Sequence, residues 1–266
     1  MEKIMNLTEL PLTQLLVISA IFGLLMGSFI SMLSWRLPRV MELEEEQQLK
    51  VISIERSKCP HCETPLPWYR LFPLFSWLAS RGKCHQCKTP ISPRYPLIEL
   101  ATAVITTLVV WQFGLNEQGI AALIFSWILI TISVIDIEHQ LILDNLSFPL
   151  LWLGLIFSTQ STFLSPVEAI WGAVVGYLVL WSVYHLFKLV TGKEGMGYGD
   201  FKLLAALGAW FGALLLPQII LIAALTSIAF TLINGLLTKQ SIHNPMAFGP
   251  FLALGGFVTL FFGILF

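Results

Sequence analysis

Two carboxyl groups at the ends of apolar stretches are the side chains of this sequence best placed to do chemistry. Asp200 closes the run Gly195-Met196-Gly197-Tyr198-Gly199-Asp200, and Asp136 closes another apolar stretch. A carboxylate near the end of a membrane helix costs free energy, so each is a candidate for a functional site. Two carboxylates that meet in a low-dielectric site share one proton. One can then activate water while the other donates a proton, which is the chemistry of aspartic proteolysis.

Structural roles are the alternative interpretation of the same acids. Asp200 could cap the N-terminus of the helix that follows it, and Asp144 could cap another helix in the same way. Asp136 could be an ordinary interfacial residue. His139 follows Asp136 by three residues and so shares its face if the helix continues. It could tune Asp136 or simply mark the interface.

Motifs for other reactions are absent from the sequence. The chain has no G-x-S-x-G and no H-E-x-x-H. The glycine-rich run is not G-x-G-x-x-G, because Asp occupies position 200, and no βαβ pattern surrounds it. These observations exclude a soluble dinucleotide-binding fold and leave the two aspartates as the leading candidates.

The composition predicts an all-α integral membrane protein. The chain is 56% hydrophobic and 12% charged, with a mean hydropathy of +0.79, whereas soluble domains carry about 25% charged residues. Seven long stretches lack Asp, Glu, Lys and Arg: 10–35, 100–116, 118–135, 145–167, 169–187, 203–238 and 240–266. Most are near the ~20 residues that span a bilayer. Pro217 divides the stretch 203–238 into two, which predicts eight transmembrane helices.

The distribution of basic residues predicts the orientation. Ten of the 15 Lys and Arg lie between Arg36 and Arg94, so the positive-inside rule makes that loop cytoplasmic and the N-terminus periplasmic. With eight spans, only Lys3 of the 15 falls outside. The first apolar stretch lacks a basic segment before it and runs into Arg36, so we expect a retained helix rather than a cleaved signal peptide.

The lengths of the expected membrane spans indicate how deep Asp200 lies in the membrane. The first span is expected at about Leu12–Leu33, followed by the loop 36–95, in which 42–48 is a solvated helical or mobile stretch. The span Leu203–Leu216 has 14 residues and covers only about 21 Å. The helix must therefore begin at or before Asp200, and the glycines before it would permit a sharp turn and a close approach of another backbone.

All four cysteines lie in the loop 36–95. Cys59 and Cys62 form one C-x2-C pair, Cys84 and Cys87 form the other, and 21 residues separate the pairs. This spacing is close to that of a zinc ribbon, and four thiolates can close a tetrahedral structural zinc site. His61 and His85 lie inside the pairs and are expected to be bystanders. Four unligated thiols are the alternative.

These residues resemble the type IV prepilin peptidase family, the bifunctional leader peptidase/N-methyltransferases of bacterial inner membranes. The resemblance covers nearly the whole chain and rests on motifs in one order. They are Gly27-Ser28-Phe29 with Arg36-Leu37-Pro38, the cysteine pairs, Trp68-Tyr69-Arg70, Ser76-Trp77-Leu78, Ile91 to Pro96, Asp136 to Gln140, Pro149 to Gly154, Gly195 to Trp210 and Phe248-Gly249-Pro250.

The resemblance implies a function and a set of site residues. Members cut prepilins and type II secretion pseudopilins on the cytoplasmic side after a leader glycine, and then methylate the new N-terminus with S-adenosylmethionine. Asp136 and Asp200 match the two catalytic aspartates, with Gly197, Gly199 and Asp144 in the active-site loop. The four cysteines match a segment linked to zinc and methyl transfer, although no S-adenosylmethionine site can be assigned.

The expected organisation follows from that match. Residues 1–113 form an N-terminal region linked to methyl transfer, and residues 114–266 form a six-helix peptidase core. The substrates would enter from the bilayer, so membrane lipids are partners and nucleic acids are not. The oligomeric state stays open.

The sequence departs from the family pattern at two places. The family's L-P-D reads Ile142-Leu143-Asp144, and 30–35 lacks the family's usual Asn. The second departure bears on methyl transfer.

An ion or proton transporter would explain paired carboxylates but not the cysteines. A zinc-stabilised scaffold with capping aspartates would explain the cysteines but assigns the acids no chemistry.

Overall fold

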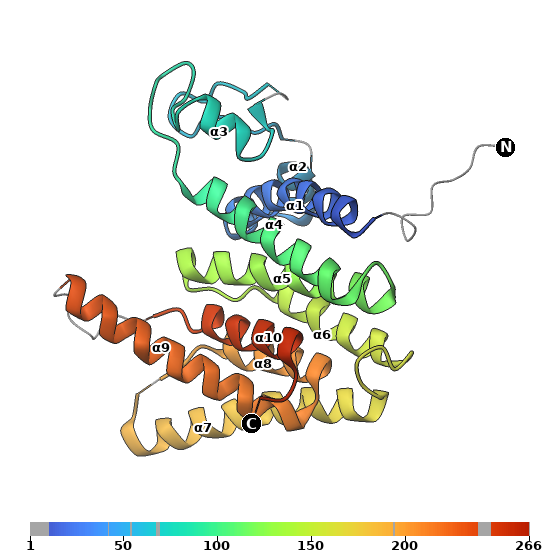
Figure 1. Ribbon diagram of the computed structural model, residues 1–266. Coiled ribbons are helices and arrows are strands. Elements are labelled where there is room, and N and C mark those ends of the chain that lie inside the picture. Colours follow the sequence, from blue (N-terminus) through green and yellow to red (C-terminus); the bar gives the residue numbers. More distant parts are fainter. Residues whose placement is uncertain are drawn as a thin grey trace. The chain divides into compact units, whose positions relative to one another are not determined.

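The computed structural model describes residues 11–41, 43–53, 55–67, 70–193, 195–238 and 246–265, and its described part is helical (Figure 1). Two isolated bridges, Lys58–Pro65 and Lys83–Pro90, are its only β pairings in the described ranges, so the all-α prediction is confirmed. The helices are α1 (Leu12–Val40), α2 (Glu45–Ser53), α3 (Phe75–Ala79), α4 (Arg94–Phe113), α5 (Glu117–His139), α6 (Asp144–Ser158), α7 (Pro166–Thr191), α8 (Tyr198–Phe211), the 3-10 turn Ala213–Leu215, α9 (Leu216–Thr238) and α10 (Gly249–Phe262). Trp68, Tyr69 and Lys3 of the sequence analysis lie outside the described residues.

In the part of the chain that the structure describes, five segments are long and apolar enough to cross a bilayer. They are α1, α4, α5, α7 and Ala213–Leu237, which contains all of α9 except its last residue. α10 is apolar but shorter, and α6 and α8 have 15 and 14 residues. A chain with this many apolar helices is a multi-pass membrane protein.

The boundaries of two expected spans differ from the sequence prediction. α1 continues past Leu33 to Val40, because Arg36 donates hydrogen bonds to the carbonyls of Val51 and Ile52 at 2.7 and 3.0 Å and ties this end of α1 to α2. α8 begins before Asp200, as predicted, but ends at Phe211 rather than Leu216. Gly212 has φ 77° there and stops the helix.

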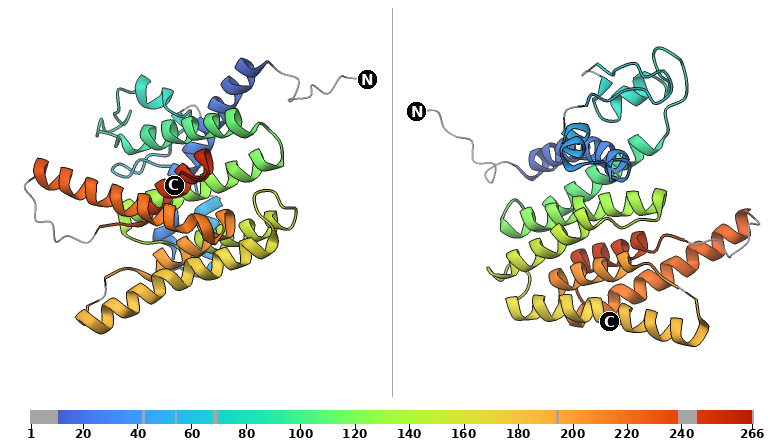
Figure 2. Two further views of the ribbon diagram at one scale, coloured as in Figure 1. Left: turned by 60° about the horizontal axis from the view of Figure 1, so that its bottom comes forward. Right: turned by 180° about the vertical axis from the view of Figure 1, so that it is seen from behind.

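The chain divides into two compact units, residues 1–127 and 128–266. In the first, α1 and α4 lie side by side (Figures 1 and 2). Gly23 and Gly27 permit the contact, because a Cβ atom on either would lie 2.6 Å from a Cα atom of α4. Small residues at a membrane-helix interface let two backbones approach in this way.

α8 is the central helix of the second unit. Eleven of its 14 residues are buried, and it contacts α6, α7, α9 and α10 (Figures 1 and 2). The crossing with α7 is the closest contact: a Cβ atom on Gly208 would lie 2.1 Å from the Gly172 carbonyl oxygen. A helix of only 14 residues is thus held by protein on most of its faces.

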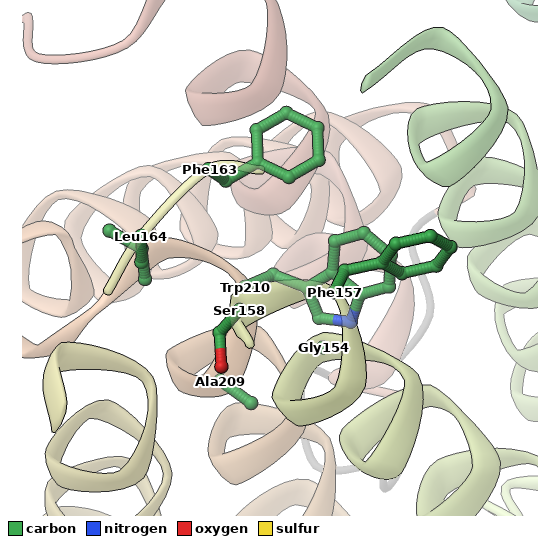
Figure 3. A pocket seen from close by; sticks show the side chains of 7 residues that line it. All are labelled: Gly154, Phe157, Ser158, Phe163, Leu164, Ala209 and Trp210. Carbon is green, nitrogen blue, oxygen red and sulfur yellow. The ribbon is translucent and has the colours of Figure 1, made fainter. Parts of the chain in front are cut away.

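A small crevice lies where α6 meets the C-terminal end of α8 (Figure 3). The indole nitrogen of Trp210 donates to the Leu150 carbonyl at 2.8 Å, and the Phe157 and Phe163 rings lie 5.7 and 5.9 Å from the Trp210 ring. The crevice is too narrow to admit a water molecule. It is a packing feature around Trp210 and contains neither candidate aspartate.

Candidate active site and metal centre

The start of α8 positions Asp200. Gly197 is the N-cap residue and makes no side-chain capping bond, so Asp200 is the third helical residue. The N-capping interpretation of Asp200 is therefore wrong, although its N–H does donate to the Gly197 carbonyl at 3.2 Å. The Asp200 side chain is 7% exposed.

The glycines before Asp200 serve close packing rather than a left-handed turn. None of the three has a positive φ, and Gly197 has φ −79°. A Cβ atom on Gly199 would lie 2.7 Å from the Cβ atom of Ile142, and one on Gly195 would lie 2.9 Å from the Phe187 ring. The glycines thus make room for side chains rather than for the expected backbone, and the expected sharp turn through glycine conformations is not found.

Asp136 lies near the end of α5 and is 4% exposed. Its Oδ2 accepts a hydrogen bond of 2.9 Å from the N–H of Gly249, the first residue of α10. A Cβ atom on Gly249 would lie 2.7 Å from the same oxygen. The sequence gives no direct sign of this contact, because 113 residues separate the partners and Phe248-Gly249-Pro250 carries no chemistry by itself.

The two aspartates meet within the second unit. Asp136 is close enough to Asp200 for their charges to repel. Ile142 lies between the elements that hold them, since it is the neighbour of both Gly199 and Gly249. Two buried carboxylates within electrostatic reach form a pair that can share one proton.

Asp144 is close to Asp136 in the sequence, but its side chain forms an ion pair with Lys202. Its Oδ1 lies 2.6 Å from the Lys202 Nζ, with the two side chains 50% and 28% exposed. Asp144 is the first residue of α6, and its N-cap is Leu143 without a side-chain bond, so the capping interpretation of Asp144 is wrong as well. The ion pair links the starts of α6 and α8, and an exposed pair of this kind contributes about 0–1 kcal/mol.

Aromatic rings hold the start of α8 against α7. Tyr184 is 3% exposed, and its ring centre lies 5.4 Å from that of Tyr198 and 5.5 Å from that of Phe201. Such edge contacts add to the packing energy of buried rings.

α5 continues to His139, so His139 shares a helical face with Asp136, as expected. The His139 Nε2 is buried and has no hydrogen-bond partner among the described residues.

The four cysteines come together in the first unit. Their Sγ atoms all lie within 4.8 Å of one another, so they could hold a metal ion. The Cys59–Cys87 and Cys62–Cys84 sulfur distances are both 3.9 Å. His61 and His85 are exposed and are not part of this cluster.

Each cysteine pair belongs to a repeated turn that the sequence analysis did not identify. Both halves read C-x-x-C-x-T-P: Cys59 to Pro65 and Cys84 to Pro90. The amide of the first Cys donates to the Thr carbonyl at 3.0 Å in one turn and 2.9 Å in the other. The backbone amides of Cys87 and Gln86 lower the pKa of the Cys84 thiol, and contact with Thr64 lowers that of Cys62. Lower thiol pKa values favour the thiolate form that binds metals.

Comparison with known proteins places both units among peptidase sequences. The family described as Bacterial Peptidase A24 N-terminal domain matches residues 21–113, and the Type IV leader peptidase family matches residues 123–232. A Prepilin leader peptidase/N-methyltransferase of Stutzerimonas stutzeri is 46% identical over 257 residues, covering 91% of this chain and 89% of the relative. Proteins of the same name from Pseudomonas aeruginosa and Aeromonas hydrophila are 46% and 43% identical over the same shares of each chain. No solved structure matches significantly.

Proposed function

Because the chain belongs to the type IV leader peptidase family, we propose that it removes the leader peptide of type IV prepilins or type II secretion pseudopilins after a glycine and then N-methylates the new N-terminal residue. It is an aspartic peptidase with methyltransferase activity. The buried pair of Asp136 and Asp200 is the observation that carries the peptidase assignment. An ion transporter would also use paired acids but would leave the cysteine cluster unexplained.

The aspartate pair would work as one acid and one base. The ionised member takes a proton from a water molecule as its oxygen attacks the scissile carbonyl carbon. The protonated member donates to the carbonyl oxygen and then to the departing amine. The proton belongs to the pair, so neither Asp136 nor Asp200 has a fixed role. The Gly249 N–H holds one oxygen of Asp136, which leaves the other free to face water.

We place the enzyme in the bacterial inner membrane with the aspartates facing the cytoplasm. The excess of Lys and Arg in residues 36–95 supports this orientation. Eight apolar helices of at least 14 residues occur in the described ranges, α1 and α4 to α10, which supports eight spans. The apolar substrate helix would enter from the lipid, where the exposed Trp171, Leu178 and Val179 of α7 line the surface.

Zinc is the metal that best fits the four thiols. A tetrahedral zinc–sulfur distance of about 2.3 Å places its sulfurs about 3.8 Å apart, close to the 3.9 Å found for two of the sulfur pairs. We propose a structural role, because four protein ligands leave no open position for a reactant.

The zinc assignment predicts metal content directly. The purified full-length chain is expected to carry about one zinc per molecule. That content should fall to near zero when Cys59 and Cys62 are replaced by serine, because two ligands cannot retain the ion. Mass spectrometry of metals on freshly reduced protein makes the measurement. The double variant His61→Ala, His85→Ala is the matched control and should keep its zinc; wild-type protein without metal would contradict the assignment.

Methyl transfer is assigned to the region 1–113, and the peptidase core to 114–266. S-adenosylmethionine would supply the methyl group when bound. The cysteine turns and α3 lie in the first of these regions and lead into α4. The chain's own contribution would be to hold the new N-terminus and remove its proton.

A coupled assay tests the proposed function. Membranes that contain the full-length chain are incubated with a prepilin and a labelled methyl donor, and the product is analysed for leader loss and for label. Leader removal followed by label on the new N-terminus is expected. An ion flux through liposomes with no cleavage would support the transporter instead.

Gly249→Ala is expected to reduce cleavage without loss of folded protein. The added methyl group would meet the Asp136 Oδ2 at 2.7 Å and push the carboxylate out of position. A displacement of about 1 Å can cost about 100-fold in rate. Leader cleavage is measured with equal amounts of purified variant. Leu254→Ala, on the exposed side of α10, is the control; full activity of Gly249→Ala would show that this contact does not position Asp136.

A further inference from the structure

A buried carboxylate in the first unit has no part in the chemistry described so far. Glu99 lies in the second turn of α4 and is 7% exposed. Its Oε2 accepts a hydrogen bond of 2.6 Å from the Leu74 N–H, and the Ser28 hydroxyl is its other hydrogen-bond partner. A carboxylate can accept about four hydrogen bonds, so Glu99 has unused capacity.

No basic side chain among the described residues forms an ion pair with Glu99. Arg94, one turn earlier on α4, donates to the Ser34 hydroxyl at 2.7 Å and lies 5.8 Å from the centre of the Trp35 ring. Buried charges in proteins are normally paired, because removal of an isolated charge from water is costly. Glu99 therefore has no cationic partner in the part of the chain that the structure describes.

Glu99 also lies where the cysteine loop joins the membrane helices. Leu74, which donates to it, has φ 58° and is the N-cap residue of α3. Trp77 of α3 donates from its indole nitrogen to the Ile91 carbonyl at 3.2 Å and packs against Gly82, next to the second cysteine turn. On the other side, the backbone of Glu99 lies against Gly27 of α1. A group bound at Glu99 would therefore lie between the segment that carries the cysteines and helix α1.

A second buried polar group of the first unit lies on α1, four residues after Gly27. Ser31 is 1% exposed, and its hydroxyl has no hydrogen-bond partner among the described residues. A buried hydroxyl without a partner costs free energy, so a polar ligand would relieve it. Glu99 itself offers an anionic group with spare hydrogen-bond capacity to a ligand that carries positive charge and N–H donors.

We propose that the Glu99 carboxylate binds the N-terminal ammonium group of the cleaved substrate and accepts its proton for methyl transfer. The assignment rests on the proposed function, which supplies such an amine and a methyl donor. The amine nitrogen loses one proton to Glu99, and its lone pair then forms the bond to the methyl carbon of the donor. The electron pair of the donor's carbon–sulfur bond passes to sulfur. The methylated product then carries the positive charge.

The variant Glu99→Gln separates this role from a structural one. Glutamine keeps an oxygen that can accept from the Leu74 N–H but cannot carry a charge or take the proton. Methyl transfer is expected to fall about 100-fold or more, the range of a lost general base. Leader cleavage should stay within about twofold of wild type, since Asp136 and Asp200 are untouched. Glu117→Gln, an exposed acid at the start of α5, is the matched control. Wild-type methylation by Glu99→Gln would overturn the proposal.

A binding measurement without methyl donor gives an independent readout. A peptide with the sequence of the mature substrate N-terminus is compared with its N-acetylated form on full-length protein in detergent. Wild type is expected to prefer the free amine by about 10- to 100-fold, and Glu99→Gln should lose that preference. An absence of preference in wild type would overturn the proposal even if the variant fails to fold.

Two further outcomes show whether the role of Glu99 or the proposed function itself is wrong. If Glu99→Gln weakens binding of labelled S-adenosylmethionine and leaves the amine preference intact, the carboxylate faces the donor's sulfonium and the proposal is wrong. If wild type neither cleaves nor methylates a prepilin, the proposed function itself fails. The amine preference of wild type would still be measured in that case and would stand or fall separately.

Discussion

Asp200→Asn is expected to abolish leader cleavage while the protein still accumulates in the membrane. Asparagine has nearly the size of aspartate but can neither take up nor release a proton, so the pair loses its acid and base functions. A loss of about 10²- to 10⁴-fold or more is expected. Asp136→Asn should have the same effect, because the proton belongs to the pair. Cleavage of a prepilin by equal amounts of purified protein makes the measurement.

The control for the aspartate variants is another acid near the same site. Glu138→Gln changes an exposed side chain two residues after Asp136 and is expected to leave cleavage within about twofold of wild type. Both aspartate variants should also keep the melting temperature of wild type or exceed it, because each removes a charge from a buried pair. Processing at the wild-type rate by either variant would mean that the pair is not catalytic.

Gly208→Val and Gly172→Val are expected to have the largest effects on stability. A Cβ atom on either residue would lie about 2 Å from the other's carbonyl oxygen, at 2.1 and 2.0 Å. Backbone cannot move away from such a contact as a flexible side chain can, so α8 would be forced off α7. The cost should reach at least about 3 kcal/mol, the upper part of the usual range for overpacking. That corresponds to a fall of about 6–12 °C in Tm.

Thermal unfolding in detergent tests this prediction. Val174→Ile is the matched control, since Val174 lies on the exposed side of α7 at 40% exposure. It is expected to shift the melting temperature by no more than about 2 °C. A Gly208→Val protein as stable as wild type would mean that α7 and α8 do not cross where the structure places them.

Local spacing made part of the site predictable from the sequence. The two cysteine pairs cluster as expected, because each C-x-x-C turn brings its own thiols together and the loop needs to join only two turns. The start of α8 before Asp200 followed from the shortness of the apolar stretch. The capping interpretations of Asp200 and Asp144 were wrong because helix ends are fixed by backbone geometry that a single residue type does not reveal.

Contacts between distant residues were not predictable in the same way. The bond from Gly249 to Asp136 and the ion pair of Asp144 with Lys202 depend on helix packing across 113 and 58 residues of sequence. In the sequence Glu99 is one acid at the edge of an apolar stretch, and only the fold shows that it is buried and accepts a hydrogen bond from the Leu74 N–H. The glycines at 195 and 199 were expected to provide turns, whereas they provide space for Phe187 and Ile142.

The most direct test of the central claim is the mass of a prepilin after incubation with purified wild-type and Asp136→Asn protein and a methyl donor. Wild type should yield a chain shortened at the leader glycine and heavier by one methyl group at its new N-terminus. Asp136→Asn should leave the prepilin at full length. A full-length prepilin with wild type, or a shortened one with Asp136→Asn, would contradict the assignment of Asp136 and Asp200 as a catalytic pair.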